Sequence, residues 1–254
     1  MICENLNYVV RSVIGNRDEQ QDCVDVFSDD DFFAAVVCDG MGGLNGGSAA
    51  SKIAVNKAVE SFSQREQFDS IPDMFINSID ILDEAVYTLT DANGNRLEAG
   101  STIVSICIEN SNLYWMSVGD SRLYILRNNE MIQATRDHNF SLYLDSVKDS
   151  YSPTAEDIDS SDALISFLGM GGISTMDISS NPVLLEENDI ILITSDGLYK
   201  VLDDEKIKIV ISEKDDIEDA ANQLLLLAEQ SAPDTRDNIS FILIKYYNKE
   251  ERKK

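Results

Sequence analysis

Residues 36–43 read VVCDGMGG, an apolar run that ends on a carboxylate and a glycine-rich turn. The run predicts a buried strand that delivers Asp39 to a site at its end. The glycines after Asp39 permit positive φ and leave backbone groups uncovered, which suits a turn that approaches an ion or a phosphate closely. An ordinary strand turn with a solvated aspartate has the same pattern, so this stretch alone does not decide the function.

Aspartates of the same kind recur at other strand ends. Residues 189–197 (DIILITSDG) repeat the strand followed by Asp-Gly, with Asp196 at the turn. Another predicted strand leads into a Gly-Asp turn at Asp120, and Asp237 precedes the last predicted strand. Carboxylates converge in a confined site only when they are paired or neutralised. Because oxygen-only ligand sets favour magnesium, manganese or calcium over zinc, the pattern indicates a divalent-cation site.

Composition limits the class of protein. The chain has 254 residues without a linker-like or low-complexity tract, which predicts one domain over residues 1–254. Hydrophobic residues make up 43%, enough for a large core, but no apolar stretch reaches the roughly 18 to 20 residues of a membrane helix. The first residues lack a basic region followed by an apolar run, so no secretory signal is expected. We therefore expect a cytoplasmic protein.

Charge and cysteine content exclude some classes of binding partner and of metal site. Twenty basic and 46 acidic residues give a net charge of −26, which disfavours binding to nucleic acid or to an anionic membrane. The four cysteines, at positions 3, 23, 38 and 107, are scattered, and there is one histidine. This spacing suggests neither a zinc site nor a disulfide framework. Reduced thiols are expected, with Cys38 packed in a strand.

The hydrophobic pattern predicts a mixed fold. Segments dense in β-branched and aromatic residues predict strands near 7–14, 32–38, 102–109, 113–118, 122–127, 190–195 and 239–247. Helical spacing of apolar residues predicts helices at 47–63, 71–90 and 217–230. Strands in succession with outlying helices indicate an α+β fold in which two sheets pack face to face with helices outside.

The order of these motifs resembles the metal-dependent serine/threonine protein phosphatases of the PP2C (PPM) type, in particular their bacterial members. The matching segments are 15–22 (GNRDEQQD), 37–43, 48–51 (SAAS), 100–102 (GST), 118–124, 135–138 (TRDH), 167–169 (FLG), 193–198 and 237–240 (DNIS). The resemblance implies a four-layer αββα sandwich of two antiparallel sheets flanked by helices, with a metal site at one end between the sheets.

The resemblance also implies roles for individual residues. Asp39 would bridge two Mn²⁺ or Mg²⁺ ions, the carbonyl of Gly40 would contact the second ion, and Asp196 and Asp237 would complete the shell of the first. Such a pair of ions acidifies water for attack on phosphorus without a protein nucleophile. Arg17 would grip the phosphate oxygens, because a planar guanidinium binds them in a bidentate way.

Two positions depart from the best-known eukaryotic members. Gln21 stands where those members have glutamate, so Asp22 alone would carry charge near the second ion. Met41 stands where many have histidine, and it cannot protonate the leaving alkoxide. The expected general acid is then a metal-bound water. His138 is an alternative general acid, although a structural role in its loop also explains this histidine.

Asp120 matches a residue that contributes to a third, weaker metal site in the family. The alternative is that Asp120 caps its turn and pairs with Arg122.

Residues 139–163 form an acidic, weakly patterned interval that matches a mobile flap of bacterial relatives. We expect a loop with one helical turn from Ser152-Pro153, and an acidic flap should favour phosphopeptides with basic flanks. We expect a monomer that acts on phosphorylated proteins, and the family implies that these proteins are targets of a serine/threonine kinase. Two alternatives stay open: a catalytically weak or inactive module that binds phosphoproteins, and an enzyme for small phosphorylated metabolites.

Overall fold

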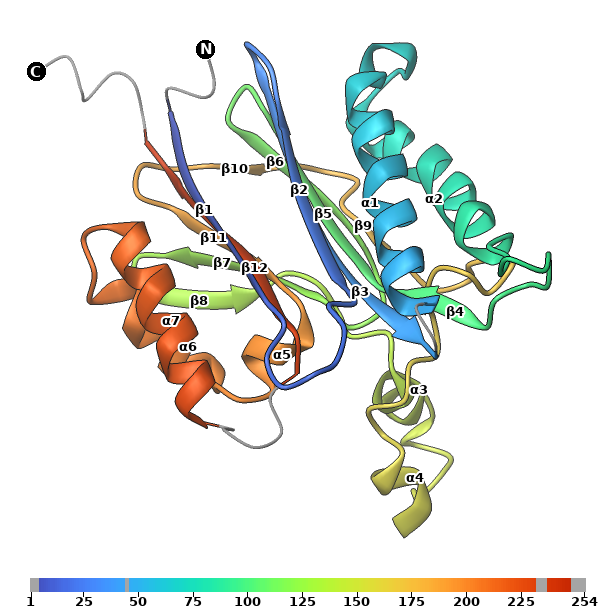
Figure 1. Cartoon of the computed structure of the whole chain (residues 1–254). Coiled ribbons are helices and arrows are strands. Elements are labelled where there is room, and N and C mark those ends of the chain that lie inside the picture. The colour runs from blue at the N-terminus through green and yellow to red at the C-terminus, as the bar shows by residue number, and fades with distance from the viewer. Residues whose placement is uncertain (1–4, 44–45, 232–236, 248–254) are drawn as a thin grey trace, which may run out of the picture.

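A computed structural model describes residues 5–43, 46–231 and 237–247. Two antiparallel sheets pack face to face, and helices cover the outer face of each sheet (Figure 1). This arrangement confirms the predicted α+β, four-layer αββα sandwich. Cys3, one of the four cysteines noted above, lies outside the described residues.

The first sheet has five strands, in an order that places the last strand beside the first. The order is β1 (Leu6–Val13), β12 (Ile239–Tyr246), β11 (Ile190–Thr194), β7 (Arg122–Arg127) and β8 (Glu130–Gln133). The second sheet has seven strands. Its main path is β10 (Val183–Leu184), β6 (Asn112–Val118), β5 (Ile103–Glu109), β3 (Phe32–Gly42) and β2 (Asp22–Ser28), while β4 (Ala99–Ser101) pairs with β3 and β9 (Asp177–Ile178) pairs with β6.

Two pairs of longer helices form the outer layers. Helices α1 (Gly46–Ser63) and α2 (Ile71–Tyr87) cover the second sheet, and α6 (Asp204–Ser212) and α7 (Ile217–Ser231) cover the first (Figure 1). Ser70 caps α2 by accepting a hydrogen bond from the backbone N–H of Asp73. A short helix, α5 (Asp196–Tyr199), follows β11 directly.

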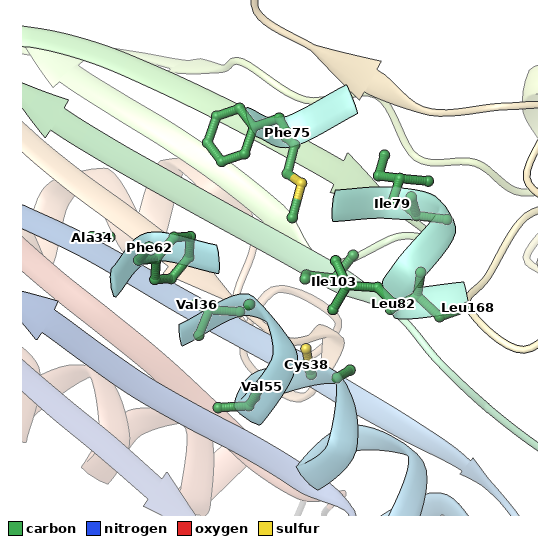
Figure 2. Close-up of a cluster of buried hydrophobic side chains, with 14 of the residues drawn as sticks. Ala34, Val36, Cys38, Val55, Phe62, Phe75, Ile79, Leu82, Ile103 and Leu168 are labelled. Carbon is green, nitrogen blue, oxygen red and sulfur yellow. The ribbon is translucent and has the colours of Figure 1, made fainter. Parts of the chain in front are cut away.

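Strand β3 reads as a continuous apolar run because both of its faces are buried. Alternate side chains point to opposite faces of a sheet. Phe32, Ala34, Val36 and Cys38 face α1 and α2, whereas the residues between them face the other sheet. Figure 2 labels Ala34, Val36 and Cys38 in the first of these clusters. Polar residues therefore begin only where the strand leaves the core, at Asp39.

The structure extends the predicted elements in several places. Strand β3 continues to Gly42, and β2 and α6 were not predicted from the sequence. The flap interval holds two helices, α3 (Phe140–Val147) and α4 (Ala155–Asp159), instead of one turn in a loop. Both helices project away from the sandwich (Figure 1), and a bridge between Asn139 and Leu164 closes the base of the flap.

No helix among the described residues is both long and apolar enough to span a bilayer.

Candidate metal centre

The predicted site residues meet at one end of the sandwich. Asp39 lies near the end of β3, Asp196 follows β11, and Asp237 and Asp120 each precede a strand by two residues. Because neighbouring strands run antiparallel, strand ends and strand starts meet at the same edge of a sheet. All four aspartates, together with Arg17, line one cavity of about 630 Å³.

The backbone of Asp39 is fixed from a neighbouring strand. Its N–H donates to Oγ1 of Thr102 at 3.0 Å, and its carbonyl accepts from the N–H of Thr102 at 2.8 Å. The same carbonyl accepts from Oγ of Ser101 at 3.1 Å. Three hydrogen bonds therefore hold this residue at the floor of the cavity before any ligand binds.

Close backbone contact explains two of the glycines. A Cβ on Gly40 would lie 2.0 Å from the carbonyl oxygen of Gly47, and a Cβ on Gly47 would lie 2.8 Å from that of Gly40. The start of α1 therefore packs directly on the end of β3, which only glycines allow. This contact leads the chain past the cavity and into the first long helix.

Asn238 organises the loop that carries Arg17. Its Oδ1 accepts from the backbone N–H of Gln21 at 2.7 Å, and its Nδ2 donates to the carbonyls of Ile14 at 2.8 Å and Glu19 at 3.1 Å. This one buried amide thus ties both ends of the loop to the start of β12. The side chain of Arg17 then reaches the cavity from the loop.

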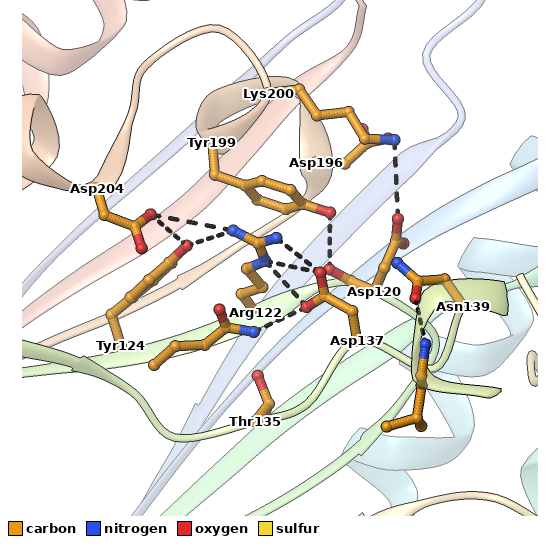
Figure 3. A network of polar contacts seen from close by, with 12 residues as sticks. Asp120, Arg122, Tyr124, Thr135, Asp137, Asn139, Asp196, Tyr199, Lys200 and Asp204 are labelled. Carbon is orange, nitrogen blue, oxygen red and sulfur yellow. Dashed lines mark hydrogen bonds and ion pairs between the residues drawn. The ribbon is translucent and has the colours of Figure 1, made fainter. Parts of the chain in front are cut away.

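Two basic side chains neutralise aspartates in the cavity. Nη2 of Arg17 lies 2.6 Å from Oδ2 of Asp237. Nζ of Lys200 lies 2.7 Å from Oδ2 of Asp196 and 3.8 Å from Oδ2 of Asp120, as Figure 3 illustrates. Both cations line the same cavity as their partners.

The pKa values report an excess of buried negative charge. Burial, and then repulsion by neighbouring aspartates, raises the pKa of Asp39 well above its ordinary value. Burial also raises the pKa of Asp120 to about 6, with Asp196 as the next cause. Asp22, which is 5% exposed, has its pKa raised to about 7 by burial, although a hydrogen bond from Ser195 opposes the shift. Divalent cations would relieve this repulsion.

The donor set fits a hard cation. The metal-binding donors among the residues that line the cavity are carboxylate, amide and backbone oxygens, with no thiol or imidazole among its described residues. Among residues 5–43, 46–231 and 237–247, no three carboxylate, thiol or imidazole groups could hold an ion as they stand. Arg17 contacts Oδ2 of Asp237 and Lys200 contacts Oδ2 of Asp196. An ion shell would therefore require Asp237 to turn from Arg17, Asp196 to offer its second carboxylate oxygen, and backbone carbonyls to add ligands.

Comparison with known proteins identifies the family. The sequence profile described as "Protein phosphatase 2C" matches residues 16–143, just over half of the chain. The chain belongs to the protein phosphatase 2C family. It is 24% identical over 212 residues to the serine/threonine phosphatase Stp of Listeria welshimeri, which covers 82% of each chain.

Solved structures agree with this assignment. The serine/threonine phosphatase of S. agalactiae is 26% identical, with a TM-score of 0.81, over 96% of this chain and 100% of the other. The catalytic domain of the phosphatase PstP, solved with two manganese ions, is 23% identical, with a TM-score of 0.75, over 96% and 99%. As a member of this family, the chain is a phosphoprotein phosphatase specific for serine and threonine, as the sequence predicted.

Within this phosphatase, one of the predicted residues lies away from the cavity. Asp22 stands opposite Asp39 in the β2–β3 register, but it is not among the residues that line the cavity. Its Oδ2 accepts a hydrogen bond from Oγ of Ser195 at 2.8 Å. Direct ligation by Asp22 therefore stays a prediction, and the structure holds this carboxyl group buried beside Ser195.

Two alternatives from the sequence are resolved by contacts. His138 is fully buried and does not line the cavity. Its Nδ1 accepts from the N–H of Gly119 at 3.1 Å, so it positions the turn before Asp120 instead of protonating a leaving group. The suggested pair between Asp120 and Arg122 is wrong, because the guanidinium bonds to Asp137 at 2.6 Å (Figure 3).

Sequence reasoning missed three residues that shape this site. Thr102 and Asn238 stood in matched motifs but were given no role, since a side chain that holds backbone groups of a distant segment leaves no local pattern. Lys200 did leave a signal, because it follows Asp196 by four residues, the spacing of neighbours on a helix.

Proposed function

We propose that Asp39, Asp196, Asp237 and the carbonyl of Gly40 hold two divalent ions, Mn²⁺ or Mg²⁺, and that this site hydrolyses phosphoserine and phosphothreonine in proteins. The observation that carries the proposal is the convergence of aspartates from both sheets on one cavity, where burial raises the pKa of Asp39. Uncompensated carboxylates in such a site are costly, and divalent cations neutralise them.

The ions, when bound, acidify water and so supply the nucleophile for attack on phosphorus. The chain itself positions the substrate. Arg17 stands at the rim of the cavity with its side chain 59% exposed, beside Asp237. When an ion engages Asp237, the guanidinium is released to bind two phosphate oxygens. Thr102 and Ser101 hold Asp39 still during this exchange.

The flap supports a preference for basic substrates. Asp162, at the end of the flap, lines the same cavity as Arg17 and Asp196. The flap interval carries further acidic residues, among them Asp145, Asp149, Asp157 and Asp159. A phosphopeptide with lysine or arginine beside the phosphorylated residue would meet this negative surface, which favours its association.

The cellular setting follows by analogy with the family. We propose that the substrates are targets of a serine/threonine kinase and that the chain acts as a monomer. The cytoplasmic location stays a prediction from the sequence.

The direct test is phosphate release from a phosphothreonine peptide by purified protein, with and without Mn²⁺. We expect Mn²⁺-dependent release that Asp39→Asn abolishes and that Asp25→Asn, on the exposed face of β2, leaves intact. Metal-loaded, folded wild-type protein that binds the peptide without releasing phosphate would favour the phosphoprotein-binding module. Faster turnover of sugar phosphates than of phosphopeptides would instead favour a metabolite phosphatase.

A further inference from the structure

The ammonium group of Lys200 lies between two carboxylates that come from different elements. Nζ is 2.7 Å from Oδ2 of Asp196, at the start of α5, and 3.8 Å from Oδ2 of Asp120, in the turn before β7. The two aspartate side chains are 17% and 8% exposed, so this pair of negative charges is largely shielded from water. Figure 3 shows the lysine side chain directed toward Asp120.

The local fold explains this placement. The N–H of Lys200 donates to the carbonyl of Asp196 at 3.0 Å, a helical contact that puts the two side chains on one face. The neighbouring Tyr199 donates from Oη to the carbonyl of Asp120 at 2.9 Å, which ties α5 to the turn. The lysine is therefore built into the site by the same segment that supplies Asp196.

The charges of this trio depend on one another. Burial disfavours the ammonium of Lys200, but Asp196 and Asp120 outweigh that cost, and the pKa of the lysine is raised. Asp196 is in turn a cause of the raised pKa of Asp120, and Lys200 opposes it. A cation is required between two such carboxylates, and here a side chain supplies it.

There is also room for an ion at this place. A second cavity of about 230 Å³ adjoins the first, and its lining includes Asp120, Asp162, Tyr199 and Lys200. Without the lysine side chain, Asp120 would face both cavities and Asp196 would face the first, each with carboxylate oxygens, which are donors that Mn²⁺ and Mg²⁺ accept.

We propose that the ammonium of Lys200 is a resident cation that takes the place of a third divalent ion between Asp120 and Asp196. The chain therefore holds two divalent ions, and the third position is closed by its own side chain. This inference rests on the two-ion site of the proposed function. In this proposal the charge of Asp120 is compensated by Lys200 and not by an exchangeable ion.

The test is the number of Mn²⁺ ions bound per chain, measured by equilibrium dialysis with electron paramagnetic resonance of free Mn²⁺, titrated into the millimolar range. We expect two ions for the wild type and three for Lys200→Ala. Lys200→Arg, which keeps a cation, should return to two. Lys206→Ala is the matched control, since this exposed lysine of α6 contacts only Asp203 among the ion pairs described, and it should bind two.

Thermal melting gives an independent readout. Addition of Mn²⁺ should raise the melting temperature of Lys200→Ala more than that of the wild type, because the variant gains a further bound ion. Three ions in the wild type, or two in a folded Lys200→Ala, would overturn the proposal while leaving the two-ion site intact. Absence of Mn²⁺ binding in the wild type would refute the two-ion site itself, and this proposal with it.

Discussion

Replacement of Gly40 by alanine should disrupt the centre without removing any side-chain ligand. The added Cβ would lie 2.0 Å from the carbonyl oxygen of Gly47 and 2.7 Å from that of Gln21. Both are backbone atoms, so the nearer separation can grow to the 3.0 Å that real contacts show only if β3 and α1 move apart. The required shift is about 1 Å, a displacement that can cost about 100-fold in rate. Overpacking adds about 1–3 kcal/mol of destabilisation.

Gly43→Ala is the matched control, because a Cβ on Gly43 meets nothing within 4 Å. Urea unfolding, followed by the fluorescence of the single tryptophan, Trp115, gives the free energy of unfolding of both variants. Steady-state kinetics on a phosphothreonine peptide with Mn²⁺ give kcat. The argument from backbone contact is refuted if Gly40→Ala matches Gly43→Ala in both stability and kcat.

Three further predictions concern the loop that carries Arg17, the carboxylate of Asp177 and the flap. Asn238→Ala removes three hydrogen bonds from the loop that carries Arg17. We expect the free energy of unfolding, measured in urea, to fall by about 2–3 kcal/mol and KM to rise. An unchanged KM would contradict the positioning role of Asn238. At Asp177, burial opposes the charge, but His138 and hydrogen bonds from Arg136 outweigh it and lower the pKa. Its carboxylate therefore stabilises the fold above the unfolded pKa of about 3.9 and loses this effect as pH falls further. Asp177→Asn should lower the free energy of unfolding, measured in urea, by about 1–3 kcal/mol at pH 7 and by progressively less below pH 4. A difference that does not change with pH would exclude the link between stability and the ionisation of Asp177. Phosphopeptides with basic flanks should show higher kcat/KM than acidic ones, with a difference that shrinks in high salt, and equal values would rule out steering by the flap.

The sequence predicted the strands that are buried on both faces and the long helices that are buried on one face. Strands β3, β11 and β12 lie between the helical layers and the other sheet, so most of their residues are apolar on both faces and the run is visible without knowledge of the fold. Helices α1, α2 and α7 bury one face over four or more turns, which gives enough length for the helical period to emerge.

The missed elements lack one of these properties. Strand β2 carries Asp22 and Asp25 among its apolar residues, so its pattern reads as polar. Helix α6 spans nine residues and shows its period only in Ile207, Val210 and Ile211. Helix α3 buries none of its side chains, so a search for a buried stripe cannot find it.

The site divides in the same way into local and non-local parts. The sequence shows locally that Asp39, Asp196 and Asp237 lie at the ends or starts of strands. The resemblance to a family then indicated that these three residues belong to one site. Which charge each aspartate meets is decided by the topology. Arg122 stands two residues after Asp120, yet Thr194↔Arg122 pairing in β7 and β11 leaves its guanidinium beside Asp137 and over the ring of Tyr199. The cation nearest to Asp120 is therefore Lys200, 80 positions away in the chain. The sequence shows this lysine only as a neighbour of Asp196. Ligand positions can thus be read from strand boundaries, whereas the cations that compete for those ligands emerge only once the strands are paired.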